Sequence, residues 1–334
     1  MASPTRRTII TGIALAAGWA GSARVHAAEN VFRISYQKGA VNLVLLKERG
    51  TIEQALKPQG WSVTWAEFPA GPQLLEALNV GAADFGEVGD TPPIFAQAAG
   101  ADIVYVGHEA PSPKNEAILV PKDSPIKTIA DLKGRKIALA KGSSVHNLLL
   151  RALEANDFAY TDVQPVFLTP ADARAAFESG AVDAWAIWDP YYAAVEIDLG
   201  ARTVANGTGL VAAVGFLIAR RPFAEGHPKV IETALAVLGD IDLWFNTHPG
   251  EAAAEMSPRL GLPAVVLQRG FERTPLGASG RSPTNKLSIV KQRVRVHGRR
   301  LSWLLGWHRS VDRSVLGCVL RASAGVAERR RAGV

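Results

Sequence analysis

Apolar positions along residues 30–260 switch repeatedly between two spacings, which predicts strands and helices in alternation. Residues 32–36 and 61–68 alternate apolar and polar side chains, as half-buried strands do, whereas 71–79 has the three-to-four-residue spacing of an amphipathic helix. The same reasoning predicts strands at 81–88, 103–106, 117–120, 137–140, 166–168, 181–187 and 201–204, and helices at 43–56, 94–99, 145–155, 171–179, 190 onward, 229–245 and 249–256. This regular alternation favours an α/β fold with largely parallel sheets.

Two stretches that lie 99 residues apart share one skeleton. The first contains Gly81, Asp84 and Asp90, and the second contains Gly180, Asp183 and Asp189 at the same spacing, each with Pro soon after the second Asp. An Asp followed by Pro is a helix-start signal, so each copy predicts helix, strand and helix. Ligand sites of α/β sheets lie where such a helix begins, at the carboxyl ends of the strands. Two copies suggest two lobes with a cleft between them, and chance similarity of α/β units is the alternative.

The order of elements predicts how the two lobes share the chain. A Pro-Ser-Pro break at 111–113 separates the first set of strands from the second, and the apolar run at 210–219 suggests that the chain returns to the first lobe there. We therefore expect a discontinuous first lobe at 29–115 plus 209–276 and a second lobe at 116–208.

The first 28 residues have the pattern of a secretory signal peptide. Arg6 and Arg7 precede an uncharged run at 8–23, and small residues at 25–28 provide cleavage positions. An uncleaved anchor and a mitochondrial presequence are the alternatives, although the run is short and Gly-rich for a membrane span. Export to a bacterial periplasm is the expected destination, by either the general or the twin-arginine route.

Charge is distributed unevenly along the 334 residues. The net charge of +6 arises from a basic tail at 277–334, with thirteen Lys and Arg against two acids, whereas 29–276 carries 29 acids against 21 bases. A nucleic-acid-binding function would therefore rest on the tail alone. The single cysteine, Cys318, excludes an intramolecular disulfide and a thiolate metal cluster.

Small and hydroxyl residues occur at two predicted helix starts, one in each lobe. Gly89 and Thr91 precede one helix, and Ser143 and Ser144 precede another. Backbone N–H groups at a helix start bind tetrahedral anions, and hydroxyls add donors, although plain helix capping explains each start equally well. The amide of Gln37, after the first strand, could also donate to a ligand.

Aromatic residues gather near the second copy of the skeleton. Trp188 immediately precedes Asp189, so it could cover an apolar part of a ligand at the cleft, with core packing as the alternative.

A catalytic function has little support in the sequence. His146 stands near two serines, but the spacing does not establish a Ser–His pair, and no cluster has metal-ligand spacing. We expect no catalytic residue, no metal site and no cofactor.

Several motifs together resemble the aliphatic sulfonate-binding proteins, the periplasmic components of ABC importers. The resemblance runs over about 32–277 and includes Gly89-Asp-Thr-Pro-Pro, Tyr36-Gln-Lys and Trp188-Asp-Pro. It implies a two-lobed, type II periplasmic-binding-protein fold that closes on an alkanesulfonate and delivers it to an inner-membrane permease. It also implies a monomeric, non-enzymatic protein that does not bind nucleic acid.

The resemblance also implies which residues surround the ligand. Gln37, Gly89, Thr91, Ser143 and Ser144 would surround the sulfonate, and Trp188 would lie near the alkyl part. Asp90 and Asp189 would cap helices, because a carboxylate facing the anion would repel it.

Two segments depart from the family pattern. Residues 212–216 read Ala-Ala-Val-Gly-Phe where family members tend to carry polar residues, which could remove a donor. After residue 277 the basic tail replaces a polar, acid-containing helical segment. A shifted reading frame or aberrant C-terminus is our hypothesis for this replacement, and a functional basic tail is the alternative.

Three other functions stay open at this point. The chain could bind another small anion, such as taurine or nitrate, or a pyrimidine precursor. It could be a secreted α/β enzyme that uses His146 with Ser143 or Ser144, or it could bind nucleic acid through the tail.

Overall fold

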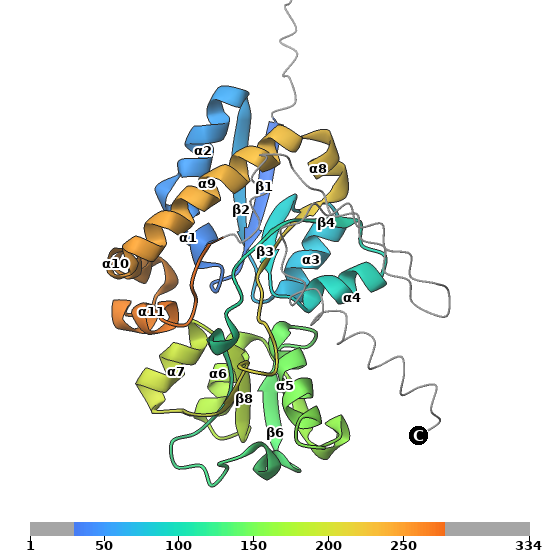
Figure 1. The fold of residues 1–334 in the computed structure, drawn as a ribbon, viewed down its shortest axis with the longest axis vertical. Helices are drawn as coiled ribbons and strands as arrows, with labels where there is room; N and C mark the ends of the chain where they lie inside the picture. Colours follow the sequence, from blue (N-terminus) through green and yellow to red (C-terminus); the bar gives the residue numbers. More distant parts are fainter. Residues whose placement is uncertain (1–29, 278–334) are drawn as a thin grey trace, which may run out of the picture.

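Strands and helices alternate through the chain and assemble into two α/β lobes, one above the other in Figure 1. The computed structural model describes residues 30–277. The upper lobe contains β1 (Asn30–Tyr36), α1 (Val41–Arg49), α2 (Thr51–Leu56), η1 (Lys57–Gln59), β2 (Trp61–Glu67), α3 (Gly71–Asn79), β3 (Phe85–Val88), α4 (Pro92–Ala98) and β4 (Ile103–His108), and then β10 (Phe216–Arg220), α8 (Arg221–Gly226) and α9 (Pro228–Thr247). A short η2 turn (Pro113–Asn115) leads from it into the lower lobe.

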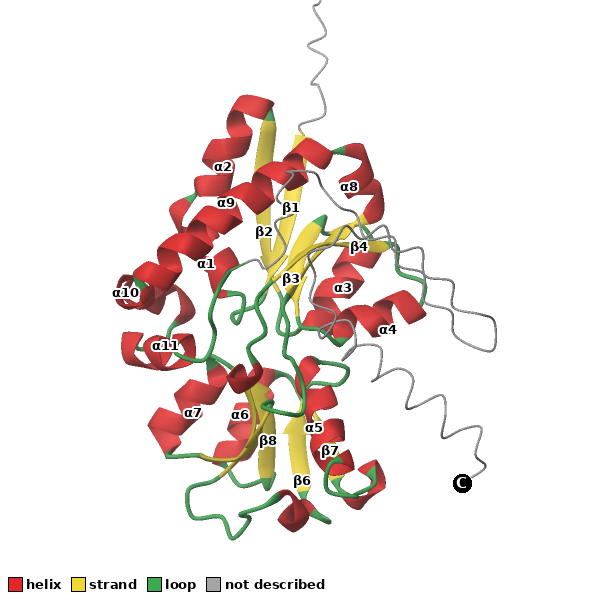
Figure 2. Ribbon diagram, in the orientation of Figure 1, coloured by secondary structure: helices red, strands yellow, loops and turns green. Residues whose placement is uncertain are grey.

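The lower lobe is formed by a continuous part of the chain. It contains β5 (Glu116–Val120), η3 (Ile129–Leu132), β6 (Lys136–Leu139), α5 (Ser144–Glu154), η4 (Tyr160–Asp162), β7 (Gln164–Phe167), α6 (Pro170–Glu178), β8 (Ala184–Trp188), α7 (Tyr191–Leu199) and β9 (Arg202–Asn206). After α9, helices α10 (Pro249–Leu260) and α11 (Ala264–Phe271) follow, and Figure 2 shows α11 directly above α7.

The two sheets have the same layout. Their strand orders are β2-β1-β3-β10-β4 and β7-β6-β8-β5-β9. In each sheet the first three strands are parallel, and the fourth is antiparallel to both of its neighbours. The predicted α/β class and two-lobed architecture are therefore confirmed, with β10 returning to the first sheet after the second lobe is complete.

The repeated skeleton has the same structural role in both lobes. Gly81 and Gly180 adopt left-handed φ angles of 75° and 72°, which glycine tolerates without a Cβ clash. Asp84 accepts a hydrogen bond from the backbone N–H of Arg33 at 3.2 Å, and Asp183 accepts one from that of Lys136 at 2.8 Å. Each Asp therefore fastens its strand to the neighbouring parallel strand, which explains why the spacing recurs.

Separate hydrophobic cores stabilise the lobes, and a small apolar contact joins them. Apolar residues of β1, α1, α9 and α10 form the largest cluster, and the second lobe has clusters on both faces of its sheet. Ala193 and Ala194 of α7 pack against Val266 of α11. Because α11 follows the helices of the first lobe, this contact joins the C-terminal part of the described chain to the second lobe.

Four predicted elements differ from the structure for local reasons. The strands predicted at 81–88 and 181–187 begin only at Phe85 and Ala184, after the turns at Gly81 and Gly180. The helix expected at 43–56 is interrupted at Gly50, whose φ of 60° ends α1 before α2 begins. The apolar run at 210–219 forms a strand only from Phe216 onward, and Ala213, Val214 and Gly215 instead line the space between the lobes.

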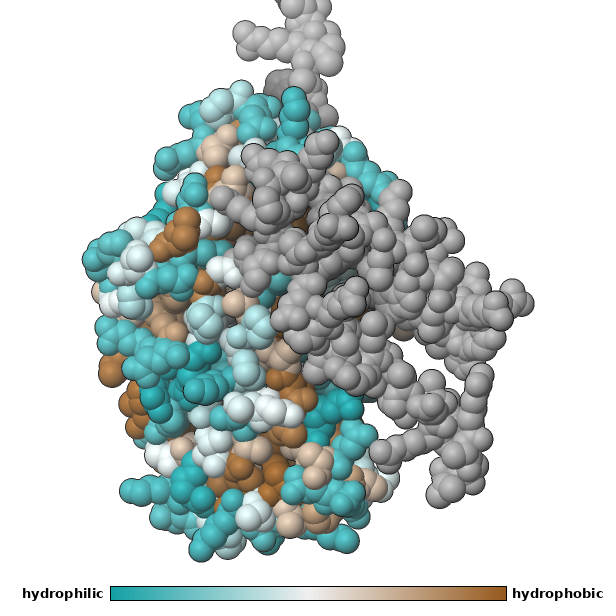
Figure 3. All heavy atoms as spheres, in the orientation of Figure 1, coloured by the Kyte–Doolittle hydropathy of each residue, from teal (hydrophilic) through white to brown (hydrophobic). Residues whose placement is uncertain are grey.

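The exposed face in Figure 3 is hydrophilic over most of its uncovered area, with apolar residues in small separate groups. Within residues 30–277, no helix is both long enough and apolar enough to cross a membrane. The predicted signal peptide at 1–28 and the basic tail at 278–334 lie outside the described residues.

Candidate functional site

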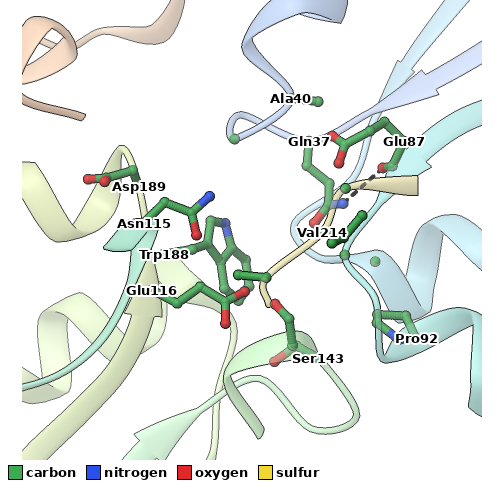
Figure 4. A pocket seen from close by; sticks show the side chains of 16 residues that line it. Gln37, Ala40, Glu87, Pro92, Asn115, Glu116, Ser143, Trp188, Asp189 and Val214 are labelled. Atoms are coloured by element: carbon green, nitrogen blue, oxygen red, sulfur yellow. Dashed lines mark hydrogen bonds between the residues drawn. The ribbon is translucent and has the colours of Figure 1, made fainter. Parts of the chain in front are cut away.

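The main pocket lies between the lobes, where strands of both sheets end. It has a volume of about 80 Å³. Both lobes and the connecting segments contribute to its lining: Gln37, Gly39, Ala40, Gly71, Glu87, Gly89, Pro92, Asn115, Glu116, Ser143, Ser144, Trp188, Asp189, Ala213, Val214 and Gly215. Figure 4 shows side chains from both lobes converging on this space. A pocket of this size suits a small molecule.

Five of the six predicted ligand residues line this pocket. They are Gln37, Gly89, Ser143, Ser144 and Trp188. Thr91 is buried but is absent from the lining, and its hydroxyl donates to the Asp90 carboxylate at 2.8 Å. The structure therefore brings residues from 37 to 188 together around one space, and a role in ligand binding stays a prediction for each.

The start of α5 provides hydrogen-bond donors that face the pocket. Ser143 precedes the helix with extended backbone angles, and its side chain makes no capping bond to the first turn. Its hydroxyl instead donates to the carbonyl of Ala140 at 2.7 Å. The N–H group of His146 donates to the Ser143 carbonyl at 3.1 Å, and no side chain caps the N–H groups of Ser144 and Val145 before it. Together with the Ser144 hydroxyl, these N–H groups form a neutral, electropositive end for an anion.

The start of α4 offers less to a ligand than its sequence suggests. Pro92 and Pro93 have no N–H group, and the Asp90 carboxylate accepts hydrogen bonds from the backbone of Thr91 and Val214. Asp90 thus uses the backbone N–H of Thr91, whereas the N-cap residue of α4 is Thr91 itself and no side chain caps this helix, so the predicted capping role of Asp90 is not seen. Gly89 still approaches the second lobe closely, because a Cβ added there would lie 3.1 Å from Ser144.

The amide of Gln37 is partly committed to the fold. Its Nε2 donates to the backbone carbonyl of Glu87 at 3.1 Å, which the dashed line in Figure 4 marks. This bond fixes the orientation of the side chain at the pocket wall. Preorganised polar groups lose less entropy when a ligand binds, so the constraint is compatible with the predicted role.

Two carboxyl groups in the lining were missed by the sequence reasoning: Glu87, which is half-buried, and Glu116, which is buried. Burial, and then the charges of Glu109 and Asp242, raise the pKa of Glu87 to about 8. Burial, and then the charge of Asp90, raise the pKa of Glu116 to about 8, against a smaller opposing effect of Ser144. Both groups are mainly protonated at neutral pH, and so they can donate hydrogen bonds. The available signal was an acid within an otherwise apolar strand, at 87 and at 116.

Trp188 and Asp189 lie side by side but face different surroundings. Trp188 lines the pocket, and its ring edge would touch a Cβ added at Gly39 of the first lobe. Asp189 accepts a hydrogen bond from the N–H of Ala193 at 3.0 Å, which confirms that it caps α7. In Figure 4 its carboxylate points away from the other labelled side chains, and it pairs with Arg273.

The departure at 212–216 places backbone and small side chains at the pocket. Ala213, Val214 and Gly215 all belong to the lining, and Ala213 has a left-handed φ of 49°. None of these side chains can donate a hydrogen bond. The segment therefore lines the pocket without a side-chain donor, which agrees with the expectation that the departure from the family pattern removes one.

His146 is engaged away from the two serines. Its Nδ1 accepts a hydrogen bond from the N–H of Gly142 at 3.1 Å, so its Nε2 carries the proton and lies 2.9 Å from the Tyr160 hydroxyl. Both ring nitrogens are thus occupied, and neither serves as a base for Ser143 or Ser144. In the described part of the chain, no three His, Cys, Asp or Glu residues could hold a metal ion.

Comparison with known proteins identifies the family. The NMT1/THI5-like family model matches residues 57–232. A relative from Escherichia coli (strain K12), named as a candidate aliphatic sulfonates-binding protein, is 52% identical over 243 residues, which cover 73% of this chain and 76% of the relative. The chain belongs to the aliphatic sulfonate-binding proteins.

Solved structures of this family have the same architecture. The alkanesulfonate-binding protein SsuA from Xanthomonas axonopodis pv. citri, bound to MOPS, is 46% identical with a TM-score of 0.72, over 76% of this chain and 88% of that one. The periplasmic aliphatic sulphonate binding protein SsuA from Escherichia coli is 49% identical with a TM-score of 0.68, over 77% of this chain and 88% of that one. The resemblance inferred from the sequence is confirmed.

Proposed function

We propose that this chain captures an aliphatic sulfonate between its two lobes and delivers it to the membrane permease of an ABC importer, without catalysis. The observation that carries the proposal is the start of α5, where uncapped N–H groups and Ser144 face a pocket between the lobes. Family membership supports the same ligand class.

The chemistry of a sulfonate matches the lining. A sulfonate is ionised at neutral pH and only accepts hydrogen bonds, so neutral donors and a helix start can bind it without a buried cation. No Lys or Arg belongs to the pocket lining, which is drawn entirely from the described residues. Trp188 offers an apolar surface for the alkyl chain, and Gln37 and Gly89 complete the wall near the helix start.

The remaining assignments follow from this function. We infer export to the periplasm by a cleavable signal peptide at 1–28 and action as a monomer, with lobe one at 29–115 plus 209–276 and lobe two at 116–208. The shifted-frame hypothesis for the tail predicts that the cognate gene encodes a polar, acid-containing segment in another frame. An intact gene without such a frame would contradict it.

Isothermal titration calorimetry with a panel of small anions tests the ligand class. Ethanesulfonate and butanesulfonate should bind, and nitrate should bind far more weakly. Ser144→Ala should weaken sulfonate binding about five- to twenty-fold, since it removes one hydrogen bond to a charged group. Ser179→Ala, an exposed serine at the end of α6, is the matched control and should bind as the wild type does. Tight nitrate binding without sulfonate binding would contradict the proposal.

A further inference from the structure

Glu116 is a buried carboxyl group with an unused oxygen at the pocket. It is the first residue of β5, it is 4% exposed, and it belongs to the pocket lining. Its Oε2 is buried and has no hydrogen-bond partner. Figure 4 shows the carboxyl group among the pocket-lining side chains, near Ser143.

The groups around Glu116 provide no positive charge. The Ser144 hydroxyl of α5 hydrogen-bonds to its side chain, the charge of Asp90 acts on it from the segment before α4, and Trp188 is its pairing partner on β8. Asn115 precedes it, and Glu87 stands elsewhere in the lining. The buried cation Arg273 is paired with Asp189 and Glu196 and does not belong to the pocket lining. A buried carboxylate without a cation is costly, and the group avoids that cost by keeping its proton.

A neutral carboxyl group has one O–H donor that needs an acceptor. Its pKa of about 8, raised mainly by burial, keeps most of the group protonated at pH 7. The α5 start, where the sulfonate is expected, lies beside it through Ser144. The Ser144 hydroxyl hydrogen-bonds to this carboxyl group, whereas Oε2 has no partner. A sulfonate brings only acceptors, so it can accept a hydrogen bond from a protonated Oε2.

We propose that Glu116 binds the ligand as a carboxylic acid and donates a hydrogen bond to a sulfonate oxygen, so that capture requires this proton. The inference rests on the proposed function. It makes Glu116 a proton-dependent specificity residue: the deprotonated form repels the sulfonate and removes the donor at the same time.

Calorimetric titration of the exported protein with ethanesulfonate at pH 6.5–9.5 tests this inference. Ethanesulfonate stays ionised throughout, so the protein alone supplies any pH dependence. With a group that titrates near pH 8, wild-type affinity should fall about 30-fold between pH 7 and pH 9.5, and binding at pH 9 should take up a proton. Proton uptake is measured from the binding enthalpy in buffers of different ionisation enthalpy.

Three variants separate Glu116 from its surroundings. Glu116→Gln keeps a donor without a titrating proton, so it should bind within about threefold of the wild type at pH 7 and lose most of the pH dependence. Glu116→Leu removes the donor and should bind at least tenfold more weakly at pH 7. Glu87→Gln should retain most of the loss of affinity at alkaline pH. Thermal unfolding of each variant verifies that it is folded.

Other outcomes would overturn the inference. Wild-type affinity that is constant from pH 6.5 to 9.5, or a fall abolished by Glu87→Gln rather than by Glu116→Gln, excludes the Glu116 proton. A Glu116→Gln variant that loses 2-aminoethanesulfonate but not ethanesulfonate would show that Glu116 binds an ammonium group as a carboxylate. Failure of every sulfonate to bind at every pH would overturn the proposed function as well.

Discussion

The Nε atom of Arg273 lies 3.2 Å from Oδ2 of Asp189, and both side chains are less than 10% exposed. Arg273 follows α11, whereas Asp189 caps α7 beside the pocket. The same guanidinium contacts Glu196 at 2.7 Å and stacks over the Tyr192 ring at 3.7 Å. This cluster, with the Ala193, Ala194 and Val266 contact, joins the C-terminal part of lobe one to the ligand-facing end of lobe two.

We predict that Arg273→Met destabilises the protein by about 3 kcal/mol, because it leaves Asp189 buried without its cation. Burial already raises the pKa of Asp189 to about 7 against the opposing effect of Arg273, so the variant should raise that pKa further. Urea unfolding at pH 7 measures the loss. Arg269→Met is the matched control: Arg269 also pairs with Glu196 but is half exposed, so we expect less than about 1 kcal/mol. Equal losses in the two variants would contradict the prediction.

Glu87 should make the ligand-free protein less stable at alkaline pH. Its folded-state pKa is raised from 4.5 to about 8, so the folded state binds more protons than the unfolded state between these values. Its contribution to stability is therefore complete below pH 4.5 and is lost as the pH rises toward 8.

Glu87→Gln should remove this dependence. Between pH 5 and pH 9, the free energy of unfolding of the wild type should fall by about 2 kcal/mol more than that of the variant. The difference is kept this small because water in the pocket reaches Glu87. Unfolding in urea across this range measures it. Glu232→Gln, which changes an exposed acid on α9, should follow the wild type. A Glu87→Gln curve parallel to the wild type would exclude the effect.

Gly39 should be required for the lobes to close. A Cβ at this position would lie 3.0 Å from the carbonyl oxygen of Asp189 and 3.2 Å from the Trp188 ring, which belong to the other lobe. Gly39→Val should therefore weaken sulfonate binding at least tenfold and leave the unfolding midpoint nearly unchanged, because the lobes can stay apart. Gly226→Val, where an added Cβ meets nothing within 4 Å, is the control. A Gly39→Val variant that binds the sulfonate as tightly as the wild type would show that close approach of the lobes at Gly39 is not needed for binding.

Trp188 should set the preference for alkyl chain length. Each methylene group that is transferred from water to an apolar surface contributes about 0.8 kcal/mol, or roughly fourfold in affinity. In the wild type, affinity should rise from ethanesulfonate to butanesulfonate, and in Trp188→Ala this rise should be largely lost. Calorimetry with both ligands gives the ratio. A ratio unchanged by Trp188→Ala would place the alkyl chain elsewhere.

Much of the fold could be read from the sequence because its signals are local. The alternation of strands and helices depends on the spacing of apolar residues, and the repeated Gly and Asp positions mark helix ends and strand joints that recur in both lobes. The interruption at Gly50 was missed, since a lone glycine within an apolar helical pattern is ambiguous before its φ is known.

The candidate site was predictable only in part, because most of its contacts join residues that are distant in the sequence. Ser143, Ser144 and Gly89 could be proposed because helix starts have local signatures. Thr91 carries the same signature, but its hydroxyl donates to Asp90 outside the pocket lining, and the distant backbone N–H of Val214 also donates to that carboxylate.

The sequence by itself determined the two-lobed α/β class, the family and the approximate starts of most helices, because these depend on neighbours in the chain. Only the tertiary structure decided that Glu87 and Glu116 enter the pocket, that Arg273 reaches Asp189, and that Gly39 lies against Trp188. These groups are separated by tens to hundreds of residues, and their burial and pKa values arise from the distant groups that the fold places around them.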